Sequence, residues 1–161
     1  MPPAPSIRLI APDTSSAVLI GYSGGVDSTV LLHLLASDTA IRTRGLRALH
    51  VHHGLQPDAD LWADHCLRIC GSLDIDCEIA RVMVERDSGL GTEAAARQAR
   101  RAVFARILHA GETLALAHHR DDQAETFLLR ALRASGPDGL ASMRPWRDFA
   151  GGWLWRPLLG T

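Results

Sequence analysis

Lysine is absent from this sequence, and all seventeen basic residues are arginine. A Walker-type nucleotide site places a lysine on the terminal phosphates, and Schiff-base catalysis requires a lysine amine, so both chemistries are excluded for this chain. The chain also lacks a run of about twenty apolar residues and a basic-then-apolar leader. The sequence therefore predicts a cytoplasmic protein with no membrane span.

Cysteine is scarce too. Cys66 and Cys70 lie one helical turn apart in an apolar stripe, and Cys77 follows. This spacing predicts buried free thiols, and it is not the C-x-x-C spacing of a zinc ribbon or a thiol-relay enzyme.

Net charge is only −1, but it is unevenly distributed. Residues 1–90 hold 7 arginines against 11 acidic residues, whereas residues 91–161 hold 10 against 7. The mildly basic second half suits contact with a nucleic acid, although a stand-alone nucleic-acid binder carries far more positive charge. Further protein would have to help hold any polynucleotide.

Length and hydrophobic pattern predict one soluble domain. The chain has 161 residues, of which 47% are hydrophobic, enough for a core covered on both sides. Short apolar runs alternate with helical patterns, which predicts an α/β fold: a doubly wound parallel sheet of about five strands with helices on both faces. The expected strands are 17–20, 46–51, 75–84, 113–117 and 153–155. Residues 1–16 are expected to form a flexible N-terminal segment.

A glycine-rich turn joins the first expected strand to a helix and reads SGGVDS at 23–28. Gly24 and Gly25 can take positive φ and let the backbone approach a ligand, while free N–H groups at the helix start attract negative charge. Ser23 and Ser28 add hydroxyl donors. A tight connection is the alternative interpretation. The residue order matches neither G-x-x-x-x-G-K-[ST] nor G-x-G-x-x-G, and it resembles the pyrophosphate loop of the N-type ATP pyrophosphatases.

Histidines mark the end of the second expected strand, at His50, His52 and His53. Alternation on a strand sends neighbouring side chains to opposite faces, so a histidine-lined strand end competes with a metal site here. Open α/β sheets bind ligands at the ends of their strands.

The fourth expected strand ends in a cluster of titratable residues, which begins at His118 and includes Asp121, Asp122 and Glu125. Two aspartates in a first helical turn are good partners for the helix dipole, which is the structural alternative. The density of the cluster, and the phosphate loop on a companion strand, favour a functional site.

The helix expected at 93–109 carries several arginines. A solvated basic face is one interpretation. Arg97 and Arg100 lie one turn apart, however, so both can reach a single anion.

Four segments in order resemble the tRNA(Ile)-lysidine synthase family. They are SGGVDS at 23–28, HVHHGLQ at 50–56, TEAAARQARRAVF at 92–104 and LALAHHRDDQAETFLLRALRASG at 114–136, followed by GLASM and RPLL. The resemblance covers roughly residues 17–159. The sequence departs from the family at His52, where Asn is usual, at Arg101, where an aromatic residue is common, and at Ala134, where Gly is usual.

The resemblance implies a fold, a reaction and its substrates. The fold is Rossmann-like, of the adenine nucleotide alpha hydrolase type, and 17–161 is the PP-loop catalytic domain, truncated before linker and C-terminal tRNA-binding domains. ATP would adenylate the C2 carbonyl oxygen of the wobble cytidine of tRNA(Ile) with a CAU anticodon, releasing pyrophosphate. Free L-lysine would then displace AMP, which makes the enzyme a ligase that forms a carbon–nitrogen bond. We also consider a homodimer.

The resemblance also assigns roles to residues. Mg²⁺ would bind Asp27 and Asp122, and adenine would lie near the end of the second strand. The implied catalytic residues are Asp27, Arg97, Arg100, Asp121, Asp122 and Glu125. The implied ATP-binding residues are Ser23, Gly24, Gly25, Val26, Asp27, Ser28, His50, Val51, His52 and His118.

Three other functions compete with this one. A tRNA 2-thiocytidine synthase shares the pyrophosphate loop but relies on C-x-x-C cysteines. A metal-dependent phosphoesterase could use His118, His119, Asp121 and Asp122 without consuming ATP. A nucleotide-binding fragment without activity is the third.

Overall fold

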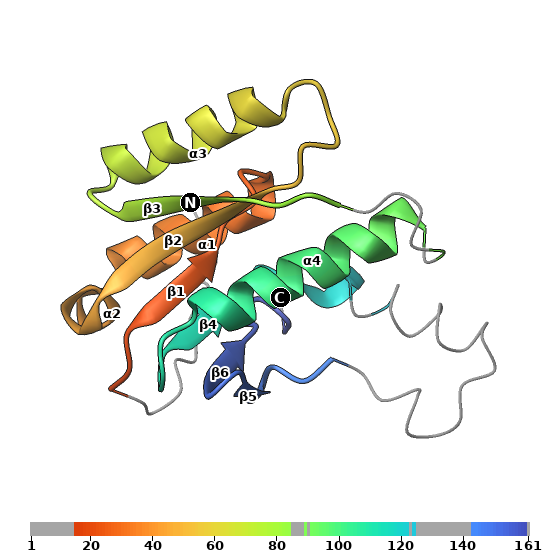
Figure 1. The fold of residues 1–161 in the computed structure, drawn as a ribbon. Helices are drawn as coiled ribbons and strands as arrows, with labels where there is room; N and C mark the ends of the chain where they lie inside the picture. Colours follow the sequence, from red (N-terminus) through yellow and green to blue (C-terminus); the bar gives the residue numbers. More distant parts are fainter. Residues whose placement is uncertain (1–14, 85–88, 90, 123, 125–142, 161) are drawn as a thin grey trace, which may run out of the picture.

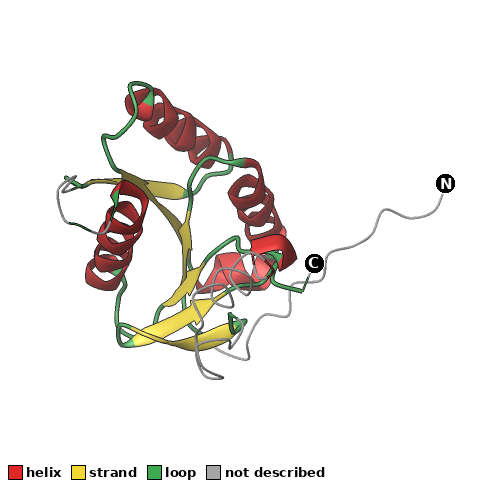
Figure 2. Cartoon of the chain, turned by 90° about the vertical axis from the view of Figure 1, so that its right-hand side faces the viewer, coloured by secondary structure: helices red, strands yellow, loops and turns green. Residues whose placement is uncertain are grey.

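The structure is a computed structural model that describes residues 15–84, 89, 91–122, 124 and 143–160, and it forms a sheet between layers of helices (Figures 1 and 2). Along the chain the elements are β1 (Val18–Gly21), α1 (Val26–Ser37), α2 (Thr39–Arg44), β2 (Leu46–His52), α3 (Ala59–Ser72), β3 (Asp76–Arg81), α4 (Thr92–Ile107), β4 (Thr113–Ala115), β5 (Trp146–Phe149) and β6 (Gly152–Trp155).

The sheet has six strands in the order β3-β2-β1-β4-β6-β5. All five predicted strands are present and parallel, which confirms the predicted fold class. The strand that was not predicted, β5, pairs antiparallel with β6 at one edge. Ala150 and Gly151 join these two strands with φ values of 48° and 77°, as in a two-residue hairpin turn.

The strands are buried on both faces, as expected for a parallel sheet covered by helices. On one face Val18 and Ile20 pack with residues of α1, α2 and α3. On the other face Leu19 packs with Phe104 of α4. Figure 2 shows these helices in layers on opposite sides of the sheet. Among the described helices, none is long and apolar enough to cross a membrane.

A bidentate ion pair ties β2 to the segment before β4. Arg47 donates to both carboxylate oxygens of Glu112, at 2.9 and 2.7 Å, and His109 N–H donates to Glu112 Oε2 at 2.9 Å. Glu112 is only 4% exposed. Burial favours the neutral acid, but the hydrogen bonds from Arg47 and His109 outweigh it and lower the pKa of Glu112. The ionised pair is therefore part of the folded structure.

The chain order fixes where a ligand can enter. From β1 the chain passes through α1 to β2 on one side, and it returns through α4 to β4 on the other side of β1. Beyond β4 the sheet continues to β6 and β5, so the strands that follow β1 and β4 in the chain lie on opposite sides of this central pair. This divergence is the topological switch point at which open α/β sheets bind ligands.

Candidate active site

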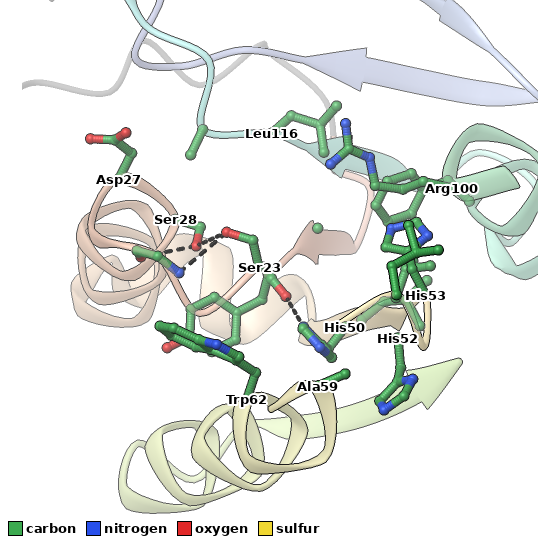
Figure 3. A pocket seen from close by; sticks show the side chains of 18 of the residues that line it. Ser23, Asp27, Ser28, His50, His52, His53, Ala59, Trp62, Arg100 and Leu116 are labelled. Carbon is green, nitrogen blue, oxygen red and sulfur yellow. Dashed lines mark hydrogen bonds between the residues drawn. The ribbon is translucent and has the colours of Figure 1, made fainter. Parts of the chain in front are cut away.

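A cavity of about 580 Å³ opens at the switch point, at the carboxyl ends of β1, β2 and β4 (Figure 3). Most of the predicted site residues line it: Ser23, Gly25, Val26, Asp27, Ser28, His50, Val51, His52, Arg100, His118 and Asp122. The glycine loop and the segment after β4 thus meet in one cavity, although 90 residues separate them in the chain.

Other predicted residues lie elsewhere. Arg97 does not line the cavity, and its side chain is 72% exposed beside Glu93, with 3.5 Å between Nη2 and Oε1. Asp121 is exposed outside the cavity lining, and Gly24 is also outside it. Glu125 is outside the described residues.

The two loop glycines have different conformations. Gly24 has φ 83°, and a Cβ there would lie 2.9 Å from Cys66 Sγ, so both its conformation and its close approach to α3 require glycine. Gly25 has φ −74° and ψ 171°, so it does not use the positive-φ region that is open to glycine. Gly25 is the N-cap residue of α1, and its carbonyl also accepts bonds from the hydroxyls of Ser28 and Thr29 at 3.1 and 2.8 Å.

The first three backbone N–H groups of α1 have no acceptor within the helix. The first helical bond runs from Thr29 N–H to Gly25 C=O at 3.0 Å, so the N–H groups of Val26, Asp27 and Ser28 come before it. Ser23 Oγ lies 2.9 Å from Ser28 Oγ (Figure 3). The result is a concentration of N–H donors at the positive end of a helix dipole, with the hydroxyls of Ser23 and Ser28 beside them, which suits a phosphate chain.

Two histidines line the cavity as opposite tautomers. His50 Nδ1 lies 2.9 Å from the Tyr22 carbonyl, which only accepts, so the proton is on Nδ1 and Nε2 is an acceptor. His118 Nδ1 accepts from Arg156 Nε at 3.3 Å, so its proton is on Nε2. Burial and the charge of Arg156 together lower the pKa of His118 to about 4, and burial also lowers the pKa of His50. Both rings are neutral at physiological pH.

The side chain of His52 contacts two other side chains of the protein and is therefore not available to a ligand. Its Nε2 lies 3.0 Å from Asp60 Oδ1 of α3 and 3.2 Å from Arg81 Nη1 of β3. Arg81 also donates to Asp60 at 2.8 Å, which lowers the pKa of Asp60. The backbone of β2 at this point remains part of the cavity lining.

The sequence interpretation left His53 out of the site. Its ring lines the cavity on the same side as Arg100 (Figure 3), and among the described residues its buried Nδ1 has no hydrogen-bond partner. Burial, followed by the charge of Arg100, lowers the pKa of His53. A neutral histidine beside an arginine can offer a ligand both an acceptor and a donor.

Trp62 of α3 is another residue that was missed. Its helical spacing with Cys66 is typical of a core position, but the indole is 46% exposed and lines the cavity (Figure 3). Its Cε3 atom lies 3.3 Å from the position that a Cβ on Gly24 would take. An exposed indole beside a phosphate-type loop can stack on a nucleobase.

Asp27 and Asp122 approach one another around His119, a member of the predicted cluster after the fourth strand to which the resemblance gives no role. His119 Nε2 lies 3.3 Å from Asp27 Oδ2 and 3.7 Å from Asp122 Oδ2. Within the described part of the chain, no group of three His, Cys, Asp or Glu side chains is arranged to hold a metal ion. Mg²⁺ usually binds one or two carboxylates together with water and substrate phosphates, so this pair of aspartates beside the helix start fits Mg²⁺ bound with a nucleotide.

The fold and the cavity together define an open α/β protein with a glycine-rich anion loop at its switch point. Comparison with known families agrees: the chain belongs to the PP-loop domain family, which matches residues 5–161.

The expected free thiols are confirmed, since Cys66, Cys70 and Cys77 form no disulfide and the first two are fully buried.

Relatives give more detail. The chain is 70% identical over 142 residues to a tRNA(Ile)-lysidine synthase of Xanthomonas axonopodis pv. citri, an alignment that covers 88% of this chain and 32% of the relative. It is 50% identical to a tRNA(Ile)-lysidine synthase of Pseudomonas syringae pv. tomato, over 99% of this chain and 36% of the relative. The chain thus spans about a third of the length of these curated relatives.

A solved structure resembles the fold. The U34-tRNA thiolase NcsA from Methanococcus maripaludis superposes with a TM-score of 0.69, covering 93% of this chain and 54% of that chain. Because the two sequences are only 19% identical, this likeness concerns the fold alone.

Proposed function

We propose that this chain is the ATP-binding, adenylating part of a ligase that joins free L-lysine to C2 of the wobble cytidine of tRNA(Ile). The observation that carries the proposal is the 70% identity to a tRNA(Ile)-lysidine synthase over 88% of the chain. The single cavity that joins the glycine loop to Arg100, His118 and Asp122 supports it. A tRNA substrate would place the reaction in the cytoplasm.

The first step is attack of the cytidine C2 oxygen on the α-phosphate of ATP, with pyrophosphate as the leaving group. Negative charge grows on the pyrophosphate, and the N–H groups at the start of α1 together with the hydroxyl of Ser23 would stabilise it. Asp27 and Asp122 would hold Mg²⁺, which when bound neutralises phosphate charge. Arg100 lies across the cavity from the loop (Figure 3), and we propose that Arg100 and the Nε2–H of His118, which also lines the cavity, donate to the α-phosphate.

In the second step the amine of lysine forms a bond to C2. The C2–O bond breaks, the oxygen leaves on AMP, and the amine loses a proton. We propose that Asp121, on the segment that follows β4, steers a cationic amine toward the site, and we propose the same role for Glu125. This reaction explains why a chain without lysine can carry the chemistry, because the lysine is a substrate.

Product analysis on the full-length protein tests the proposal. With ATP, L-lysine and tRNA(Ile) bearing a CAU anticodon, we expect equal amounts of AMP and pyrophosphate and a tRNA that carries the added lysine. Omitting the tRNA should abolish both products. Formation of ADP and phosphate, at a rate independent of lysine, would contradict the proposal and favour a hydrolase.

A further inference from the structure

Three arginines that the proposed chemistry does not use converge on one face of the sheet. Arg147 of β5 pairs with Leu154 of β6, and Leu154 belongs to the core cluster under α4. Because side chains alternate along a strand, Arg156 points to the same face as Leu154. The ladder continues to this residue, since Arg156 N–H donates to the Pro145 carbonyl at 2.8 Å.

The third arginine comes from the helix above that face. The guanidinium carbon of Arg101, in α4, lies 5.5 Å from the ring centroid of Phe149. Phe149 is two residues after Arg147, so both side chains project from β5 toward α4. We name Arg101, Arg147 and Arg156 the arginine cluster.

No acid of the described residues balances the positive charge of the arginine cluster. Arg156 is only 9% exposed, and its guanidinium donates to two neutral acceptors, His118 Nδ1 at 3.3 Å and the Arg144 carbonyl at 2.7 Å. Among the described residues, none of the three has a carboxylate within 4.0 Å, and the buried Nε of Arg147 has no partner. Burial, and then the charges of Arg147 and Arg101, lower the pKa of Arg156 to about 10.

Such an arrangement costs free energy unless an anion joins it, because a buried charge needs a partner and like charges repel. Guanidinium groups bind phosphate through two parallel hydrogen bonds and are common in nucleic-acid sites. The cluster also lies apart from the glycine loop, since β6 is two strands away from β1, or about 10 Å at the usual strand spacing. The triphosphate proposed for the loop would not fill it.

We propose that the arginine cluster is a second anion site, which binds a backbone phosphate of the RNA next to the reacting nucleotide. This inference rests on the proposed function, in which a tRNA base enters the cavity. Arg156 contacts His118, and His118 lines the cavity, so one side chain separates the cluster from the reacting centre. A phosphate held there would fix the register of the base.

Salt-dependent tRNA binding by the full-length protein tests this site. Each phosphate contact contributes a slope of about −0.7 to −0.9 to a plot of log affinity against log salt. We expect Arg147→Gln and Arg101→Gln each to reduce the slope by about that amount and to weaken binding about fivefold at 0.15 M salt. Arg147→Lys should keep the slope. ATP affinity should match that of the unchanged protein, and the Gln variants should unfold at the same temperature or a higher one, because each removes a repelling charge.

The matched control is Arg68→Gln, which removes the same charge from an exposed position on α3. The proposal that the arginine cluster binds a phosphate is contradicted if Arg147→Gln leaves the salt-dependence slope unchanged. It is also contradicted if Arg68→Gln reduces that slope equally, which would indicate a diffuse charge effect. A loss of ATP affinity instead would assign the cluster to the nucleotide. If the unchanged protein binds ATP but no tRNA, the proposed function itself fails.

Discussion

His119 Nε2 lies 3.3 Å from Asp27 Oδ2, and this contact joins the segment after β4 to the first turn of α1. His119 Nδ1 accepts a bond from the backbone N–H of Asp121 at 3.2 Å, so the proton on the neutral ring is at Nε2 and points to the Asp27 carboxylate. The contact therefore holds a carboxylate at the mouth of the glycine loop before any nucleotide binds.

Replacement of Asp27 tests the role of that carboxylate. Asp27→Asn keeps the shape and removes the charge, so ATP affinity should fall about tenfold or more and should no longer depend on Mg²⁺. Isothermal titration with and without Mg²⁺ measures both quantities. Asp148→Asn, an exposed change on β5, is the control and should behave like the unchanged protein. A Mg²⁺ response that persists in Asp27→Asn would remove this residue from the metal site.

Arg97 and Arg100, two of the arginines of α4, should differ in their effect on catalysis. Arg100 lines the cavity, whereas Arg97 is exposed beside Glu93 and lies one turn nearer the helix start. We expect Arg100→Ala to slow single-turnover adenylation about a hundredfold with little change in tRNA affinity, because its interaction is made mainly in the transition state. Arg97→Ala should slow it far less. Equal effects would show that α4 is placed differently when substrate is bound.

Trp62 should report nucleotide binding directly. Base–aromatic stacking contributes about 1–3 kcal/mol, so Trp62→Ala should weaken ATP binding about fivefold or more while Trp62→Phe retains most of the affinity. Addition of ATP should also quench tryptophan fluorescence, and this change should disappear in Trp62→Phe. Leu67→Ala, at another exposed apolar position of α3, serves as the control. Undiminished quenching in Trp62→Phe would place the base elsewhere.

The pair of Arg47 and Glu112 should dominate stability at the other end of the sheet. Arg47→Met leaves a buried carboxylate without its partner, which should cost about 3–5 kcal/mol in the free energy of unfolding. Adding Glu112→Gln to that variant should recover part of the loss. Urea denaturation at pH 7 measures both variants, and a loss below about 1 kcal/mol would show that the pair contributes little.

Acid should destabilise the protein through His118. Its pKa is about 4 in the folded state against 6.5 for the free side chain, so the unfolded chain binds the proton first. This contribution to stability is complete above pH 6.5 and is lost as pH falls toward 4, by up to about 3 kcal/mol. His118→Gln, whose side-chain oxygen can still accept from Arg156, should make unfolding stability fall less steeply between pH 6.5 and 5. His33→Gln, an exposed change on α1, should leave the profile unaltered.

Local patterns predicted much of this molecule. Buried parallel strands are continuous apolar runs, and SGGVDS has a distinctive order, so the five parallel strands and the loop could be placed without a structure. The edge strand β5 was missed because Arg147 and Asp148 interrupt its apolar pattern and its pairing depends on the hairpin turn at Ala150. A six-residue helix, α2, was missed because it has too few turns to show a period.

The site was harder to predict where tertiary placement decides a role. Trp62 has the spacing of a core residue, and only the position of α3 relative to the glycine loop exposes it to the cavity. The sequence places Arg97 and Arg100 one turn apart on the same helix and does not distinguish their roles, but only Arg100 lines the cavity. The charge of Arg100 acts on His53, and His119 contacts Asp27. Because these partners are distant in the chain, sequence periodicity does not indicate that either histidine lies in the site.

The most direct test of the central claim follows the α-phosphate of ATP. The full-length protein, tRNA(Ile) and ATP labelled at the α-phosphate are mixed without lysine, and the tRNA is then separated from free nucleotide. The proposed chemistry predicts label on the tRNA as an adenylated cytidine, with one pyrophosphate released for each label and release of labelled AMP when lysine is added. Label found only in free ADP or AMP, with none on the tRNA at any time, would contradict it.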